Sequence, residues 1–291
     1  MTGPTVTKPT VTGPTASRVT IVVATRNRWD DLRRSLPRHP RPVVLVDNAS
    51  TDCTAEKVAR CFPDVMVVRL ARNAGAVGRN EGVRAATTPY VAFADDDSWW
   101  EPGSLDRAAD LLDDHPRLAL LAARVLVGEG SEVDPVCTEM ARSALGVRLG
   151  EPGPRVLGFI ACGAVVRRSA YLAAGGFDPV TFFAGEEERL ALDLAARGWG
   201  LCYAPELVVH HMPSATRDVA ARVVRIARNE VLTAVMRRPG REVVRTLARH
   251  AASGQGRRGV LASVPRLPGA LRARRPLPAE VEAARRLLDD S

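Results

Sequence analysis

The chain has 291 residues, of which 46% are hydrophobic and 25% are charged, and its formal net charge is +8. These proportions are typical of a soluble globular protein with one large or two small domains, and they exclude a chain that is disordered throughout. No stretch approaches the ~18 consecutive apolar residues of a membrane-spanning helix, so an integral membrane protein is excluded as well.

The N-terminus is a Thr/Pro-rich repeat in which Pro4, Pro9 and Pro14 are evenly spaced. Because proline disrupts both helices and sheet ladders, we predict a disordered lead-in over residues 1–17. The five cysteines form no CxxC pair, and the start of the chain lacks a signal-peptide pattern. We therefore expect reduced thiols and a cytoplasmic protein.

From residue 18, β-branched runs alternate with helical patterns. Buried strands are predicted at 19–24, 43–47, 65–70 and 90–94, with helices at 25–36, 54–61 and 75–86 between them. This alternation predicts a parallel sheet with right-handed crossovers. Ligands of such sheets bind beyond the carboxyl ends of the strands, where the polar clusters of this chain lie.

The later part of the chain is less regular. The patterns predict, in order, a helix at 103–115, a strand at 118–127, an irregular stretch at 128–155, extended chain at 156–168, a short helix ended by Gly175–Gly176, a helix at 186–197 and a strand at 201–211. Helices follow from 215, broken at 254–259, with a last one at 278–290. Residues 212–291 carry 17 basic and 7 acidic side chains, a net charge of +10.

Three adjacent aspartates, Asp95 to Asp97, follow the fourth buried strand. Their carboxylates repel one another, and a cation that prefers oxygen ligands, such as Mg²⁺ or Mn²⁺, would offset that repulsion. Because side chains alternate along an extended chain, we expect Asp95 and Asp97 to converge and Asp96 to point away. A solvated acidic turn explains the same residues, and the pattern alone favours neither interpretation.

Two further clusters end neighbouring strands. Asp47 can accept hydrogen bonds from a ribose or a pyrimidine N–H, or form an ordinary Asx turn. The glycine-bearing segment 73–82 lets backbone approach a ligand and supplies the Arg79 guanidinium for a phosphate. This segment is not GxGxxG and follows the third strand, so a dinucleotide site is disfavoured.

Three adjacent glutamates and two adjacent histidines stand near the end of this region. Glu186 to Glu188 open a helix, where they either cap it or supply a general base. His210 and His211 end a strand, where they either face solvent or complete a metal site.

Taken in order, these segments resemble the family 2 glycosyltransferases with the GT-A fold. The matching segments are VTIVVATRNR, VVLVDNASTD, NAGAVGRNEGVRAA, YVAFADDDSWWEPGSL, GAVVRRSAYLAAGGFD and GEEERLALDLAARGW. The resemblance implies an α/β glycosyltransferase domain over 18–212, in which a Rossmann-like nucleotide-binding sheet continues into a smaller acceptor-binding half. A basic helical extension over 213–291 follows it.

The resemblance also implies the site residues. Asp95 and Asp97 match the D-x-D motif that holds Mg²⁺ or Mn²⁺, with His210 or His211 as a third ligand, of which we take His210. Glu187 stands at the catalytic-base position, where the family often has Asp, with Glu186 and Glu188 as alternatives. The residues assigned to the nucleoside-diphosphate sugar are Thr25, Arg26, Asp47, Asn73, Gly75, Arg79 and Asp96.

The implied reaction is metal-dependent transfer of a sugar from a nucleoside-diphosphate sugar to an acceptor hydroxyl, with inversion. A sugar-phosphate nucleotidyltransferase is the alternative, but its glycine-rich first loop is missing from residues 24–29. A nucleic-acid-binding protein ranks third, because it leaves the acidic clusters unexplained, and we expect no nucleic-acid partner.

The basic extension has two interpretations. It can be helical packing with a solvated face, which we favour slightly, or a cationic face against anionic lipid at the inner side of a membrane. The arginines considered for that face are Arg217, Arg222, Arg225, Arg228, Arg237, Arg238, Arg241, Arg245 and Arg249.

Overall fold

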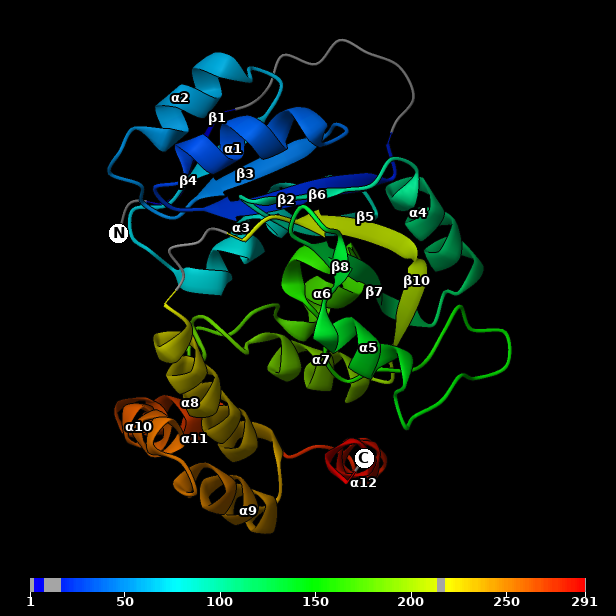
Figure 1. Cartoon of the computed structure of the whole chain (residues 1–291), viewed down its shortest axis with the longest axis vertical. Helices are drawn as coiled ribbons and strands as arrows, with labels where there is room; N and C mark the ends of the chain where they lie inside the picture. The colour runs from blue at the N-terminus through cyan, green and yellow to red at the C-terminus, as the bar shows by residue number, and fades with distance from the viewer. Residues whose placement is uncertain (1–2, 8–16, 214–217, 291) are drawn as a thin grey trace.

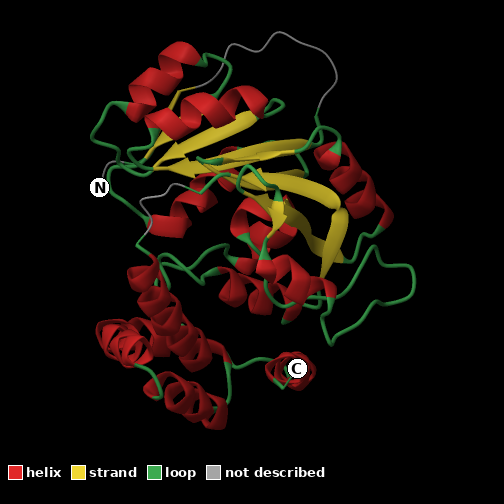
Figure 2. Ribbon diagram, viewed as in Figure 1, coloured by secondary structure: helices red, strands yellow, loops and turns green. Residues whose placement is uncertain are grey.

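The structure is a computed structural model that describes residues 3–7, 17–213 and 218–290. One ten-stranded sheet runs through its upper part, with helices on both faces (Figures 1 and 2). The strand order is β1-β4-β3-β2-β5-β9-β7-β10-β6, and β8 pairs with β7. The strands are β1 (Thr5–Thr7), β2 (Val19–Thr25), β3 (Val43–Asp47), β4 (Met66–Arg69), β5 (Tyr90–Asp95), β6 (Ser98–Trp100), β7 (Leu118–Val127), β8 (Glu132–Val133), β9 (Ala164–Arg167) and β10 (Gly200–His211).

The predicted parallel sheet is β4-β3-β2-β5. Its three inner strands, β3, β2 and β5, are mostly apolar runs that are buried almost throughout, as expected of strands covered on both faces. The register pairs Thr25 with Asp47 and Ala24 with Asp95. These polar residues therefore reach the same edge of the sheet.

The second half of the sheet is mixed. β9 lies antiparallel between β5 and β7, β10 runs parallel to β7, and β6 pairs antiparallel with the end of β10. This pairing returns the chain to the Asp95–Asp97 turn, because His211 of β10 stands opposite Ser98 of β6.

The helices of the sheet region cover both of its faces. Figure 1 shows α1 and α2 on one face of the parallel strands and α3 on the other. The helices of this region are α1 (Trp29–Ser35), η1 (Leu36–Arg38), α2 (Thr54–Cys61), η2 (Gly75–Val77), α3 (Gly78–Ala85), α4 (Ser104–Asp114), α5 (Pro135–Ala141), η3 (Ala161–Gly163), α6 (Arg168–Ala174) and α7 (Glu187–Ala195).

The C-terminal helices form a separate layer below the sheet (Figure 1). They are α8 (Val219–Arg237), α9 (Gly240–Ala251), α10 (Gly254–Ser263), η4 (Val264–Arg266), α11 (Leu267–Arg272) and α12 (Ala279–Asp289). Their small core contains Leu232, Met236 and Ala270. A buried ion pair ties this layer to α7: Arg237 Nε lies 2.5 Å from Asp193 Oδ1.

Several predicted elements differ from the structure. The stretch 128–155, predicted to be irregular, contains β8 and α5. Part of the lead-in expected to be disordered is strand β1, which pairs antiparallel with β4 through residues 5–7; residues 1–2 and 8–16 lie outside the described residues. Extended chain was expected over 156–168, but only Ala164–Arg167 is a strand. The domain boundaries at 18, 212 and 213 remain our proposal.

The predicted break at 254–259 is wrong, because α10 begins at Gly254. Ser253 caps this helix by accepting a hydrogen bond from the Gly256 backbone N–H at 2.9 Å. A Cβ at Gly259 would lie 2.6 Å from the Ala227 Cβ. The glycines that were predicted to break the helix thus allow α10 to pack closely on α8.

Candidate active site

The carboxyl ends of the parallel strands open into a cleft of about 430 Å³. Six of the seven residues predicted to bind the donor line it: Thr25, Arg26, Asn73, Gly75, Arg79 and Asp96. The facing wall comes from Phe182, Phe183 and α8. The cleft therefore lies between the Rossmann-like strands and the later half of the chain.

Asp47 is the predicted donor residue that does not line the cleft. It is 4% exposed, and its carboxylate accepts hydrogen bonds from the backbone N–H and the hydroxyl of Ser50. The Asx turn that the sequence left open as an alternative is the arrangement found here.

The three adjacent aspartates separate as the strand ends. Asp96 turns toward β2, where Thr25 Oγ1 donates a hydrogen bond to its Oδ2 at 3.1 Å. Burial, together with the charges of Asp97 and Asp95, raises the pKa of Asp96 to about 8. Asp97 turns the other way and lies 3.3 Å from His211 Nε2. Asp95 contacts Arg79 at 2.6 Å.

The structure does not place His210, which we took as the third metal ligand, beside the aspartates. His210 hydrogen-bonds Glu101 and stacks on Trp99 with ring centroids 5.4 Å apart. His211 has ligand atoms within 4.8 Å of those of Asp95 and Cys162. Neighbouring residues of a strand face opposite sides of the sheet, so only His211 faces the aspartates.

This set of donors fits a divalent cation. The carboxylates of Asp95 and Asp97 suit Mg²⁺ or Mn²⁺, and the His211 nitrogen is a ligand that first-row transition metals accept. Burial and the charges of Asp95 and Asp97 raise the pKa of the Cys162 thiol well above its usual value. Cys162 is therefore a protonated neighbour of the set, and its place among apolar residues gave no signal in the sequence.

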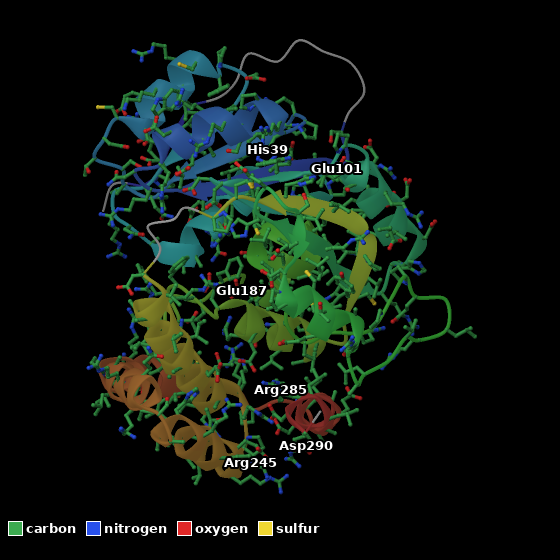
Figure 3. The ribbon with its side chains drawn as sticks, viewed as in Figure 1. His39, Glu101, Glu187, Arg245, Arg285 and Asp290 are labelled. Carbon is green, nitrogen blue, oxygen red and sulfur yellow. The ribbon has the colours of Figure 1, made fainter. Side chains whose placement is uncertain are left out.

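The three glutamates that open α7 point to different partners. Glu188 forms an ion pair with Arg285 of α12 at 2.8 Å, which turns it away from the cleft. Glu186 is 2% exposed and lies 3.8 Å from Arg79 Nη1; burial and the charge of Glu187 raise its pKa to about 8. Glu187 is partly exposed, and burial raises its pKa as well. Figure 3 shows Glu187 between the sheet and α8.

Asn48 and Phe182, two residues that the sequence did not single out, shape the donor side. Asn48 lines the cleft and holds the loop beside it: its Oδ1 accepts from the Ala74 N–H, and its Nδ2 donates to the Gly75 carbonyl, each at 3.2 Å. Gly75 has φ +61°, and a Cβ there would lie 2.4 Å from the Phe182 carbonyl oxygen. The Ala76 N–H donates to that oxygen at 2.7 Å, so backbone joins the two walls.

A family model described as glycosyl transferase family 2 matches residues 20–173. The chain belongs to this family. It is therefore an enzyme that transfers a glycosyl group, as the sequence motifs predict, and the predicted GT-A fold is confirmed by the solved structures it resembles.

Two relatives from Mycobacterium tuberculosis are similar to this family 2 glycosyltransferase. One is an N-acetylglucosaminyl-diphospho-decaprenol L-rhamnosyltransferase, 31% identical over 219 residues that make up 63% of this chain and 71% of the relative. The other is a pre-mycofactocin glycosyltransferase, 32% identical over 214 residues, 70% of this chain and 45% of the relative.

Solved structures of glycosyltransferases share the fold at low identity. The mannosyltransferase PcManGT from Pyrobaculum calidifontis, in complex with GDP-Man and Mn²⁺, aligns with a TM-score of 0.58 and 21% identity, over 94% of this chain and 75% of that one. S. aureus TarS in complex with UDP-GlcNAc aligns with a TM-score of 0.55 and 18% identity, over 94% of this chain and 88% of that one.

Proposed function

We propose that this family 2 glycosyltransferase moves a sugar from a nucleoside-diphosphate sugar to an acceptor hydroxyl with inversion. The observation that carries the proposal is the cleft itself, in which the polar ends of β2 and β5 lie opposite Phe182, Phe183 and α8. Glu186, at the start of α7, lies 3.8 Å from the guanidinium of Arg79, which lines this cleft. The complexes of fold neighbours with GDP-Man and UDP-GlcNAc support a nucleotide-sugar donor.

On the donor side, Thr25, Arg26, Asn73, Gly75 and Asp96 line the part of the cleft that would hold the nucleotide. Asp95, Asp97 and His211 would hold Mg²⁺ or Mn²⁺, which supplies Lewis-acid stabilisation of the leaving diphosphate when bound. The presence of Mn²⁺ in a fold neighbour supports this assignment.

On the acceptor side, Glu187 accepts the proton of the acceptor hydroxyl. The oxygen forms a bond to the anomeric carbon as the bond from that carbon to the diphosphate breaks, and the nucleoside diphosphate leaves. A base must be ionised and within reach of the hydroxyl. Glu187 suits this role better than Glu186, because Glu186 is almost completely buried. In the rhamnosyltransferase relative the named acceptor is a sugar on a diphospho-decaprenol, and we propose a sugar hydroxyl here.

The donor is tested by thermal denaturation with a panel of nucleoside diphosphates and nucleotide sugars, each with and without Mn²⁺. A ligand that binds the native state raises the midpoint, and a hundredfold excess over Kd contributes about 2.7 kcal/mol. We expect one base to shift the midpoint, and the shift to depend on Mn²⁺. Pyrophosphate release from a nucleoside triphosphate and a sugar phosphate would instead identify a nucleotidyltransferase.

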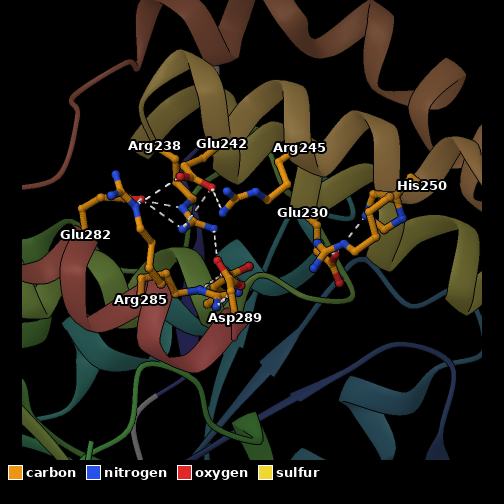
Figure 4. Close-up of polar contacts among 11 residues, drawn as sticks. Glu230, Arg238, Glu242, Arg245, His250, Glu282, Arg285 and Asp289 are labelled. Carbon is orange, nitrogen blue, oxygen red and sulfur yellow. Dashed lines mark hydrogen bonds and ion pairs between the residues drawn. The ribbon is translucent and has the colours of Figure 1, made fainter. Parts of the chain in front are cut away.

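We also propose peripheral contact with anionic lipid at the cytoplasmic face of a membrane, but through another surface than the one predicted. Arg217 lies outside the described residues, and several of the other predicted arginines are already paired. Figure 4 shows Arg238 between Glu282 and Asp289, and Arg245 against Glu242. None of the described helices is long and apolar enough to cross a membrane.

The surface that fits lipid better is the outer side of α10 to α11, which we call the α10–α11 face. Residues 243–279 contain eight arginines and no acidic residue. On this face Leu261 is 70% exposed, Val264 54% and Leu271 60%, and Arg257 and Arg258 are exposed beside them. Exposed aliphatic side chains flanked by arginine are typical of helices that lie in a membrane interface.

Co-sedimentation with vesicles tests this contact. We expect binding to anionic vesicles that high salt reverses, since each arginine near such a surface contributes about 1 kcal/mol. Arg257→Glu combined with Leu261→Ser should abolish binding. Arg148→Glu with Leu149→Ser is the matched control, because Leu149 is the fully exposed leucine of a distant loop. Equal indifference to anionic and neutral vesicles would leave the extension a structural element.

A further inference from the structure

Two arginines of α8 face into the cleft from the side opposite the donor-binding strands. Arg222 and Arg225 are three residues apart on this helix, so they project from the same side of it, and both line the cleft. The sequence placed them on a solvated basic face. Their position in the fold gives them a role in the site.

The α8 arginine pair differs from Arg79 and Arg28 of the same cleft, whose charges are neutralised by carboxylates. Arg79 contacts Asp95 at 2.6 Å, and Arg28 contacts Asp31 at 3.4 Å. Neither Arg222 nor Arg225 forms an ion pair with any residue that the structure describes. Within the same part of the chain, the buried Arg225 Nε has no hydrogen-bond partner. A buried guanidinium N–H without an acceptor is costly, and a ligand can supply the acceptor.

The pair lies across the cleft from the proposed donor residues. Arg222 and Arg225 come from α8, whereas Thr25, Arg26 and Asp96 stand at or just beyond the ends of β2 and β5. The donor diphosphate has its own proposed partners, Arg79 and the metal ligands, at the end of β5. An anion bound by the α8 arginines would therefore lie next to the attacking hydroxyl of the acceptor.

We propose that Arg222 and Arg225 bind a phosphate group of the acceptor, so that the acceptor is a phosphorylated or diphosphorylated glycoside. Two guanidinium groups on one side of a helix can each present paired N–H donors to phosphate oxygens. This inference rests on the proposed function and deepens it, since it names the chemical class of the acceptor.

The test is calorimetric titration of glucose 1-phosphate into protein saturated with its preferred nucleoside diphosphate and Mg²⁺, with methyl glucoside as the neutral comparison. The loaded donor side leaves only the acceptor side open. We expect glucose 1-phosphate to bind and methyl glucoside not to. In the double variant Arg222→Gln/Arg225→Gln, binding should be about ten- to hundredfold weaker, the range of one or two charge-assisted hydrogen bonds.

The controls separate the two possible sources of phosphate. Arg148→Gln removes an exposed arginine of a distant loop and should change nothing. If the double variant loses affinity for the nucleoside diphosphate itself and keeps that for glucose 1-phosphate, the pair serves the donor and the proposal is overturned. Absence of glucose 1-phosphate binding to the nucleotide-loaded wild-type protein overturns it too.

Other outcomes remain informative. If the double variant does not fold, the single variants Arg222→Gln and Arg225→Gln replace it, because each keeps one of the two arginines. An intermediate loss of affinity for glucose 1-phosphate in both single variants supports the proposal. If no nucleoside diphosphate binds to the wild-type protein, the donor assignment has failed. In that case the titration is repeated on the free protein, where a loss caused by the double variant supports the anion site and unchanged binding overturns it.

Discussion

Asp97→Ala should lower glycosyl transfer by about 10³-fold or more, because it removes a proposed ligand of the cation that stabilises the leaving diphosphate. Lewis-acid stabilisation amounts to several kcal/mol, and each 1.36 kcal/mol is a factor of ten in rate. The fold should persist, because the substitution also relieves repulsion among three adjacent carboxylates. The measurement is turnover as a function of Mn²⁺, together with nucleotide binding in the presence and absence of the metal.

His210→Ala is the matched control for this experiment. His210 hydrogen-bonds Glu101 on the side of β10 away from the aspartates, so its loss should leave the metal dependence unchanged. His211→Ala should behave like Asp97→Ala. Full activity of the wild-type enzyme in excess EDTA would remove the metal from the mechanism.

Glu187→Gln should slow turnover about 10²- to 10⁴-fold, the usual contribution of a general base, while donor binding survives. Gln keeps the size and hydrogen bonding of the side chain but cannot take the proton. Burial raises the pKa of Glu187, so the wild-type rate should rise with pH above the usual range of a glutamate, about 4.3. That rising limb should disappear in the variant.

Two neighbouring variants decide which glutamate is the base. Glu188→Gln should keep near-normal turnover, because Glu188 is paired with Arg285 outside the cleft. A dead Glu186→Gln beside an active Glu187→Gln would show that the base is the preceding residue. Circular dichroism on each variant separates loss of chemistry from loss of fold.

The parallel half of the sheet could be predicted because its signal is local. The runs ending at Thr25, Asp47 and Asp95 are mostly apolar and almost fully buried, and each of these polar residues marks a strand end. Parallel pairing then brings these ends to one edge without any further information. The donor side of the candidate site follows from this rule.

The rest of the candidate site, and the packing behind it, depend on contacts that no local pattern contains. Counting alternate residues from the start of β10 could not predict the side of the sheet on which His210 and His211 lie. An irregularity between Ala204 and Val208 shifts the register of β10 against β7. In the sequence Gly259 predicts a helix break, and only the close packing of α10 on α8 explains why glycine stands there. Arg222 and Arg225 resemble the other arginines of the extension in sequence, and only tertiary structure separates cleft arginines from paired ones.

The backbone junction between Ala76 and Phe182 limits how far the cleft of this enzyme can be widened. Any side chain at position 75 would meet the Phe182 carbonyl, and opening that junction breaks a hydrogen bond between the two walls. The width of the cleft at this point is therefore fixed by main chain rather than by exchangeable side chains. Phe183, which is 41% exposed, carries no such constraint on its ring. A mutant library aimed at new acceptors should vary position 183 and positions along α8. Residues 75 and 76 should be kept unchanged.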